Sequence, residues 1–129
     1  MSELTKRQTL EQGRAHYAWG KIEAVNQLND DLKKKYSSIT KKAPILVLTN
    51  GLGLTLAYLL GKDEAHNLLY EHIQSWILPK QPTIQSNKRL IKYIAKCSST
   101  EYRQLTVETL AILNWIKRFA ESVLPTEEE

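Results

Sequence analysis

The stretch that decides the fold is LVLTNGLGLTLAYLL, residues 46–60, an apolar run that contains one asparagine and two glycines. Its centre, Asn50-Gly51-Leu52-Gly53, can be interpreted in two ways. A glycine-rich loop or turn could cradle a phosphate, whereas the middle of a buried helix could not. The choice between them bears on both the fold and the function.

The stretch does not satisfy either common nucleotide-binding motif. The dinucleotide motif G-x-G-x-x-G needs a third glycine where this chain has Leu56, and no strand with a suitable acidic residue follows. The phosphate loop G-x-x-x-x-G-K-[ST] needs a hydroxyl after its lysine, but Asp63 follows Lys62. A hairpin turn at Asn50-Gly51 is compatible with the dipeptide, although the run lacks period-two alternation.

A helix through the whole run fits better. Leucines and small residues fill nearly every side, and Thr49, Gly53 and Ala57 are four apart, which would form a groove for a neighbouring helix. Close packing there would offset part of the roughly 1 kcal/mol that each glycine costs a helix. We therefore predict a central buried helix, in which Asn50 must find a hydrogen-bond partner or reach the surface.

The rest of the chain also has helical patterns. A first helix is predicted over residues 3–28 and a short one around residues 31–39. Pro44 suits the first turn of the helix that follows, since its missing N–H would be unpaired there anyway. Asp63 is the expected N-cap of a helix that runs to about residue 78.

Prolines and turn residues then predict a loop over residues 78–87. Ser86 or Asn87 is expected to cap a helix that ends near residue 97. The last helix begins at Ser98 or Ser99, has Glu101 in place for a capping box, and ends at Pro125. Its apolar stripe is the most regular in the chain.

These patterns predict an all-α protein, a compact bundle of about five or six helices with a central buried helix. A length of 129 residues suits a single domain over residues 1–129 and is enough to bury a core. The C-terminal tail, from about residue 125, ends in three glutamates and is expected to be disordered.

The formal net charge is +4 and the pI about 9.2, which favours polyanionic partners but also simply keeps a protein soluble. Cys97 is the only cysteine, so a disulfide framework is excluded and a reducing cytoplasm fits. The N-terminus lacks the apolar core of a secretory signal, and the run at 45–60 is slightly short for a membrane span. We expect a cytoplasmic protein that does not enter membranes.

The sequence shows no recognisable catalytic or metal-binding constellation. The histidines do not form an HExxH motif, and one cysteine cannot build a zinc knuckle. His72 lies on the apolar stripe of its helix, which is more typical of a core histidine than of a ligand. Asp63 and Glu64 are adjacent, so they point to different faces and suit a helix cap better than an acid–base pair. We predict no enzyme activity, no metal and no cofactor.

Positive charge recurs at helical spacing instead. The rows are Arg7, Arg14 and Lys21; residues 33–35; Lys41 and Lys42; Lys88, Lys92 and Lys96; and Lys117 and Arg118. Such rows can contact nucleic-acid phosphates, or they can be ordinary solvated faces that complement helix dipoles. Without an RNP motif or a helix-turn-helix signature, the sequence supports tracking of a phosphate backbone and not reading of bases.

Three segments resemble the small subunit of the Cmr-type CRISPR effector complex, subtype III-B. They are QGRAHYAWGKIE at residues 12–23, KKAPILVLTNGLGLTLAYLLGK at 41–62, and EYRQLTVETLAILNWIKRFAE at 101–121. Their order, their spacing and the chain length all agree with that family, and the resemblance covers nearly the whole chain. Residues 79–100 carry little of the family pattern.

The resemblance implies a compact all-helical subunit that has no enzyme activity and supports antiviral defence. Such subunits form an inner filament along the guide RNA and target RNA. Their protein partners are the repeated backbone subunits, which cleave the target, the large subunit, and further copies of themselves. By analogy, six cations are expected to face RNA: Arg14, Lys21, Lys41, Lys42, Lys117 and Arg118. Four residues are assigned to packing: Gly51, Gly53, Trp115 and Phe119.

A second hypothesis is kept beside this one. The chain could be a helical scaffold that binds only proteins, with its basic faces meeting acidic partners and no direct RNA contact.

Overall fold

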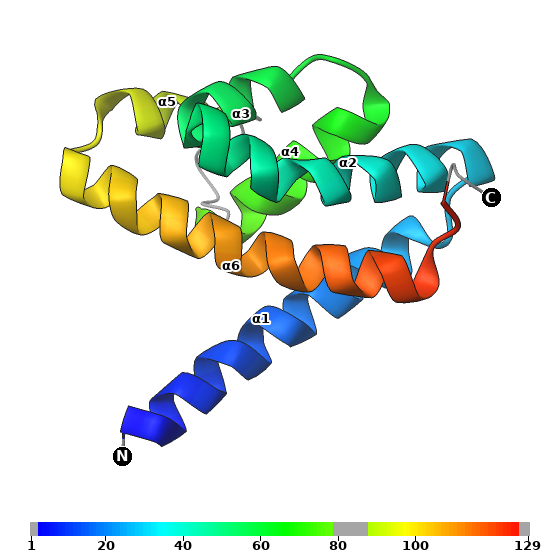
Figure 1. The fold of residues 1–129 in the computed structure, drawn as a ribbon, viewed down its shortest axis with the longest axis horizontal. Helices are drawn as coiled ribbons and strands as arrows, with labels where there is room; N and C mark the ends of the chain where they lie inside the picture. Colours follow the sequence, from blue (N-terminus) through cyan, green and yellow to red (C-terminus); the bar gives the residue numbers. More distant parts are fainter. Residues whose placement is uncertain (1–2, 79–87, 127–129) are drawn as a thin grey trace.

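The computed structural model describes residues 3–78 and 88–126, which form six helices and no strand. This confirms the predicted all-α class. The helices are α1 (Glu3–Val25), α2 (Asp30–Asn50), α3 (Leu52–Leu59), α4 (Glu64–Ile77), α5 (Arg89–Lys96) and α6 (Ser99–Val123) (Figure 1).

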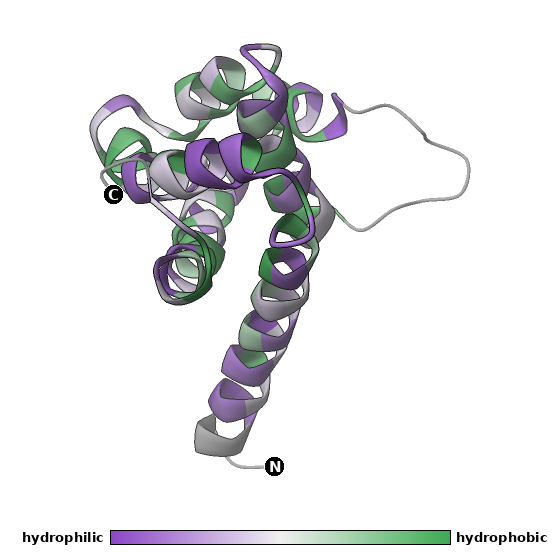
Figure 2. Ribbon diagram, turned by 90° about the vertical axis from the view of Figure 1, so that its right-hand side faces the viewer, coloured by the Kyte–Doolittle hydropathy of each residue, from purple (hydrophilic) through white to green (hydrophobic). Residues whose placement is uncertain are grey.

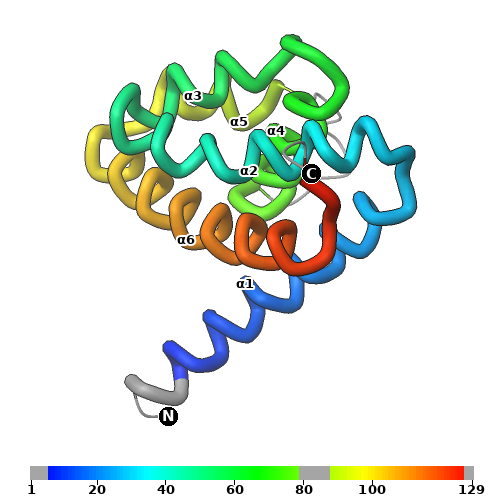
Figure 3. Tube along the Cα trace, turned by 45° about the vertical axis from the view of Figure 1, so that its right-hand side comes forward, coloured from blue at the N-terminus to red at the C-terminus, as the bar shows by residue number. Residues whose placement is uncertain are grey.

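The centre of the bundle is α2, which packs against α3, α4 and α6. α3 doubles back along α2, while α6 lies on its other side and also packs against α1 (Figures 1 and 3). The N-terminal half of α1 extends beyond the bundle, and residues 6–10 are exposed there (Figure 2). The fully buried large side chains come from every helix of the body, among them Ile22, Tyr36, Leu56, Tyr70, Leu90 and Ile112.

The apolar run at 46–60 is two helices. α2 ends at Asn50, Gly51 adopts a φ of 87°, and α3 begins at Leu52. Residues with side chains rarely adopt that φ, so the glycine permits the break. The Gly51 N–H donates to the Val47 carbonyl at 3.0 Å, and Thr55 Oγ1 donates to the Gly51 carbonyl at 2.8 Å. The prediction of one uninterrupted helix is therefore wrong at Gly51.

Only one side of this region is buried. Leu52, Leu56 and Leu59 are completely enclosed, but Leu48 is 72% exposed and Leu54 is 69% exposed. The run was expected to be buried on nearly every side because its residues are almost all apolar. Apolar composition alone does not say which side chains face the core, since a folded protein still exposes much apolar surface.

The small-residue groove is not formed as predicted, because Thr49 and Ala57 are both exposed. Gly53 alone meets another helix closely: its N–H donates to the Tyr102 hydroxyl of α6 at 2.9 Å, and a Cβ there would lie 3.5 Å from the same oxygen. Asn50 reaches the surface, which was one of its two expected outcomes.

Pro44 also differs from the prediction, because it lies inside α2 instead of opening a new helix. A proline within a helix costs about 3 kcal/mol. The helix continues through it because one face of α2 is buried on both sides of the proline, at Tyr36, Ile39, Ala43 and Val47. Tertiary packing thus overrides the local preference, and the predicted short helix merges with its successor.

The predicted helix caps on α4 and α6 are confirmed. The Asp63 carboxylate accepts from the His66 N–H at 2.9 Å, and Ser98 with Glu101 forms the capping box of α6. α5 starts after Lys88, whereas the expected caps Ser86 and Asn87 lie outside the described residues. So do the last three residues of the tail expected to be disordered, and α1 ends at Val25 instead of residue 28.

Candidate nucleic-acid interface

The six cations expected to face RNA do not share one surface. Arg14 lies in the middle of α1, where Glu108 of α6 binds its guanidinium through Nε at 2.8 Å and through NH2 at 2.6 Å. Glu11 takes a third N–H group, and Trp76 of α4 donates to Glu108 at 2.8 Å. The side chain of Arg14 is only 13% exposed.

This cluster joins α1 to α6 and α4. The hydrogen bonds that Arg14 donates to Glu108 raise the pKa of Arg14, and the same contact lowers the pKa of Glu108. Both groups therefore stay charged and paired. The geometry gives Arg14 a structural role, with its positive charge already neutralised by two carboxylates, which departs from the role expected for it. No local pattern could have revealed this pair, because its members are 94 positions apart.

Lys21 lies one turn beyond Tyr17 on α1, and its ammonium group is 5.2 Å from the centroid of the Tyr17 ring. Its charge contributes to the lowered pKa of the buried His72, so it faces the α4 side of α1. Lys21 thus lies on α1, whereas Lys41 and Lys42 lie on α2. Lys21 is therefore the outlying member of the set.

Lys41 and Lys42 lie in the middle of α2, the first half-buried and the second exposed. Neither forms an ion pair within the part of the chain that the structure describes. The preceding lysines differ in this respect, because Lys33 pairs with Asp30 at 3.2 Å and Lys35 with Asp31 at 3.3 Å.

Lys117 and Arg118 lie on α6, which packs against α2. Lys117 is half-buried and Arg118 is exposed, and no carboxylate among the described residues pairs with either. Trp115, two positions earlier, contacts Glu11 of α1, so a rotation of about 200° places Lys117 on the opposite side of α6 from α1. Arg118, three positions from Trp115, lies within about 60° of it around the helix and so does not share the side of Lys117.

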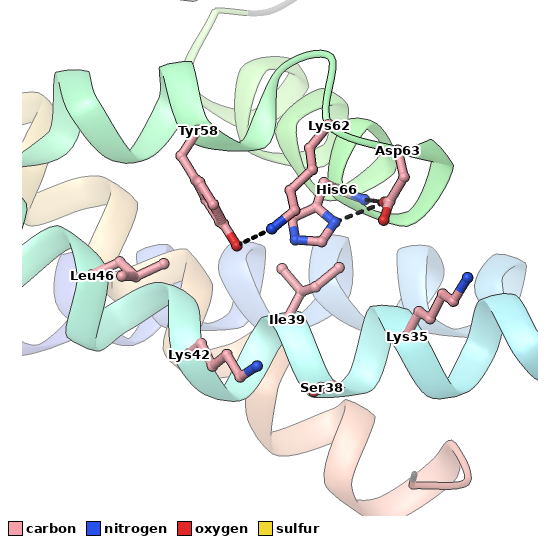
Figure 4. Close-up of a pocket in the computed structure, with 9 residues that line it drawn as sticks. All are labelled: Lys35, Ser38, Ile39, Lys42, Leu46, Tyr58, Lys62, Asp63 and His66. Atoms are coloured by element: carbon pink, nitrogen blue, oxygen red, sulfur yellow. Dashed lines mark hydrogen bonds and ion pairs between the residues drawn. The ribbon is translucent and has the colours of Figure 1, made fainter.

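A pocket of about 190 Å³ opens between α2 and the end of α3, which we call the α2–α3 pocket. One wall is formed by α2, through Lys35, Ile39 and Lys42. The other wall is formed by Tyr58 of α3, by Lys62 in the turn that follows, and by His66 of α4 (Figure 4). Lys62 donates to the Tyr58 hydroxyl at 2.6 Å and lies 4.4 Å from its ring centroid. The sequence analysis missed Tyr58 and Lys62, although their i, i+4 spacing at a helix end was visible.

The structure agrees with the packing expected of two aromatic side chains and with the core position expected of one histidine. Trp115 and Phe119 pack against each other and against the core. His72 is buried, and its Nδ1 lies 2.6 Å from the Tyr36 hydroxyl, as expected for a core histidine. Gly51 serves backbone conformation more than packing.

The described residues hold no group of three or more histidine, cysteine, aspartate or glutamate side chains able to bind a metal ion. No helix within 3–78 or 88–126 has both the length and the apolarity needed to cross a membrane. The arrangement can bind anions noncovalently through lysines beside apolar and aromatic surface.

Fold and surface together define a small all-helical protein with several lysines along α2. The model of the family described as CRISPR-associated protein (Cas_Cmr5) matches residues 10–123, so the chain belongs to the Cmr5 family. This confirms the resemblance to a small subunit of a Cmr-type CRISPR effector complex.

A solved structure gives the same result. The chain is similar to a CRISPR-associated Cmr5 family protein from Thermus thermophilus, with a TM-score of 0.77 and 25% sequence identity. The match covers 89% of this chain and 97% of that protein.

Proposed function

We propose that this protein is the non-catalytic small subunit of a type III-B CRISPR effector, forming an inner filament along guide RNA and target RNA in the cytoplasm and supporting antiviral defence. Family membership supports its place among other effector subunits. The observation that carries the RNA contact is the pair Lys41 and Lys42, two central α2 cations whose charge no described carboxylate neutralises.

The proposed RNA-contacting set follows from the placements above. Lys41 and Lys42 are its centre, Lys117 and Arg118 extend it on α6, and Lys21 lies apart on α1. Arg14 stays outside the set because Glu108 and Glu11 bind three of its five N–H donors and its side chain is only 13% exposed. Each lysine that contacts a phosphate releases a counterion, so the affinity should depend steeply on salt.

A second candidate function is a protein-binding scaffold without RNA contact. It is favoured by exposed aliphatic side chains close to the lysines in the chain: Ile45 is 61% exposed, and Leu48 and Leu54 are more so. Exposed apolar surface of this kind is typical of protein interfaces. Subunit binding by the apolar surface does not exclude RNA contact by the lysines, so the two candidates differ only in whether the lysines contact RNA.

The deciding experiment compares RNA retention across a salt series in the isolated chain and in the reconstituted effector. The variant is Lys41→Glu/Lys42→Glu, and the matched control is Lys92→Glu/Arg103→Glu, which reverses the same amount of charge at exposed positions of α5 and α6. Circular dichroism verifies that helicity is unchanged.

A direct role predicts that the variant, and not the control, loses affinity and lowers the log–log salt slope by roughly 0.7–0.9 for each lost phosphate contact. Unchanged retention with failed assembly would favour the scaffold. Filament contacts supply multivalency, so the effect should be largest in the complex.

A further inference from the structure

We propose that the α2–α3 pocket binds one unpaired nucleotide of single-stranded RNA, with its phosphate between Lys42 and Lys62 and its base against Tyr58. This inference rests on the proposed RNA-contacting function and adds the place and the form in which RNA is held. Figure 4 shows Tyr58 and Lys62 pointing down from the other wall toward Ile39, while the side chain of Lys42 runs along α2 at the edge of the pocket.

The lysines supply the anion site. Lys62 is held in place because it donates to the Tyr58 hydroxyl at 2.6 Å, and its ammonium group keeps two further N–H donors for a ligand. Lys42 has no carboxylate partner among the described residues. Lys35 adds a third positive charge, shared with Asp31 at 3.3 Å.

The acid in the pocket, Asp63, offsets only part of this charge, since Lys35 is the lysine that interacts with it. Asp63 accepts from the backbone N–H of His66 at 2.9 Å, and the ring of His66 lies 2.7 Å from the same oxygen. The backbone hydrogen bond from His66 is the main cause of the lowered pKa of Asp63. The carboxylate is thus directed to the N-terminus of α4, whose dipole it compensates. The ammonium groups of Lys42 and Lys62 remain for an incoming anion.

The shape and chemistry favour a nucleotide over other anions. A volume of about 190 Å³ is below the ~300–1,000 Å³ of sites that enclose drug-sized ligands, so the open pocket takes only part of one nucleotide at a time and leaves the rest in solvent. Ile39 and Tyr58 offer apolar and aromatic surface that an inorganic anion would not use.

The base must be unpaired because stacking on a side chain requires an accessible face. Tyr58 is 45% exposed, with Lys62 over its ring and the His66 ring meeting it edge-to-face at 5.4 Å, so a base would use the part of the ring that these two leave open. Proteins that track single strands combine basic grooves with such aromatic platforms. This arrangement accepts any base, in agreement with the lack of a base-reading motif.

The test follows backbone amide resonances of the full chain while hexauridylate is added, with inorganic phosphate and hexaglutamate as parallel probes. We expect hexauridylate to shift the amides of Lys42, Tyr58, Lys62 and His66 in a saturable way, and more strongly than phosphate. Tyr58→Leu should weaken binding about fivefold or more, as expected for one lost stacking contact, while Tyr58→Phe keeps the ring and most of the affinity.

Lys62→Gln should lower the log–log salt slope by about 0.7, the value for one phosphate contact on a single strand. Lys92→Gln, exposed on α5, removes the same charge elsewhere and should change nothing. Shifts by hexaglutamate equal to those by hexauridylate would assign the pocket to an acidic peptide and overturn the proposal. So would an absence of shifts, or Tyr58→Leu and Lys62→Gln variants that bind hexauridylate as the native chain does.

Failure of this inference can be told apart from failure of the proposed function. If Tyr58→Leu and Lys62→Gln bind hexauridylate like the native chain while Lys41→Glu/Lys42→Glu still reduces RNA retention in the effector, the nucleotide site in the pocket is refuted. The RNA-contacting function then stands. If that double variant also retains RNA like its control, the RNA-contacting function itself fails.

Discussion

Replacing Arg14 with methionine tests whether this arginine holds the fold together or contacts RNA. The change keeps a long unbranched stem and removes three charge-assisted hydrogen bonds, two to Glu108 and one to Glu11. Arg14 is 13% exposed and Glu108 is 29% exposed, so the pair lies between a surface ion pair, worth about 0–1 kcal/mol, and a buried one, whose disruption costs about 3–5 kcal/mol.

We therefore expect Arg14→Met to lower the free energy of unfolding by about 2–3 kcal/mol and the melting temperature by roughly 10 °C. Urea unfolding followed by circular dichroism gives the free energy, and Trp76 and Trp115 report on the cluster by fluorescence because they donate to Glu108 and Glu11. Glu108→Gln should act in the same direction. In a double-mutant cycle, the coupling between the two sites should be about 1–2 kcal/mol.

The control is Arg118→Met on the exposed side of α6, which should change stability by no more than about 0.5 kcal/mol. The reasoning would be contradicted if the Arg14→Met protein were as stable as this control but bound RNA less well in the effector. In that case the guanidinium would serve RNA, and the clasp between α1 and α6 would have no energetic importance.

Four further substitutions follow from the structure. Gly51→Ala should destabilise the fold by about 1–2 kcal/mol, because the φ of Gly51 is 87°. Gly20→Ala should stabilise it by about 0.5–1 kcal/mol, because Gly20 lies on open helix surface. Chemical denaturation measures both, and equal effects of the two substitutions would contradict the reasoning. Tyr102→Phe should cost about 1 kcal/mol by leaving the Gly53 N–H unpaired, and a neutral result would mean that water replaces the hydroxyl. Burial lowers the pKa of His72 from 6.5 to about 3, so between these pH values the unfolded chain binds a proton that the folded chain does not. The free energy of unfolding should therefore fall by up to about 1.4 kcal/mol per pH unit as the pH drops from 6.5 towards 3. His72→Gln should make the free energy of unfolding less dependent on pH in this range.

Local chemistry made much of the fold predictable. The capping box at Ser98 and the N-cap at Asp63 depend on residues three positions apart, and the structure has both. The apolar residues of α6 likewise recur every three or four positions, so the helix could be predicted from its own sequence. Pro44 was misjudged because the packing that holds it within α2 comes from α4 and α6, which no local pattern reveals.

The candidate site was less predictable because its contacts join distant segments. The charge of Arg14 is visible in the sequence, but its partner Glu108 lies in the last helix. Lys42 was recognised as one of a basic pair, while Tyr58 and Lys62 were assigned to a buried run and its end. Their role depends on where α3 is placed relative to α2, which the apolar composition of the run does not determine.

Gly51 connects the opening question to the site. If the helix had continued through this residue at about 1.5 Å per residue, Lys62 would lie about 30 Å from Lys42 along one axis. The break at Gly51 instead turns α3 back along α2, so that Tyr58 and Lys62 lie across the pocket from Ile39 and Lys42 (Figures 1 and 4). The glycine does not cradle a phosphate itself, as a phosphate loop would. It acts indirectly, because the conformation that only glycine adopts easily brings a lysine of α2 close to the lysine in the turn after α3.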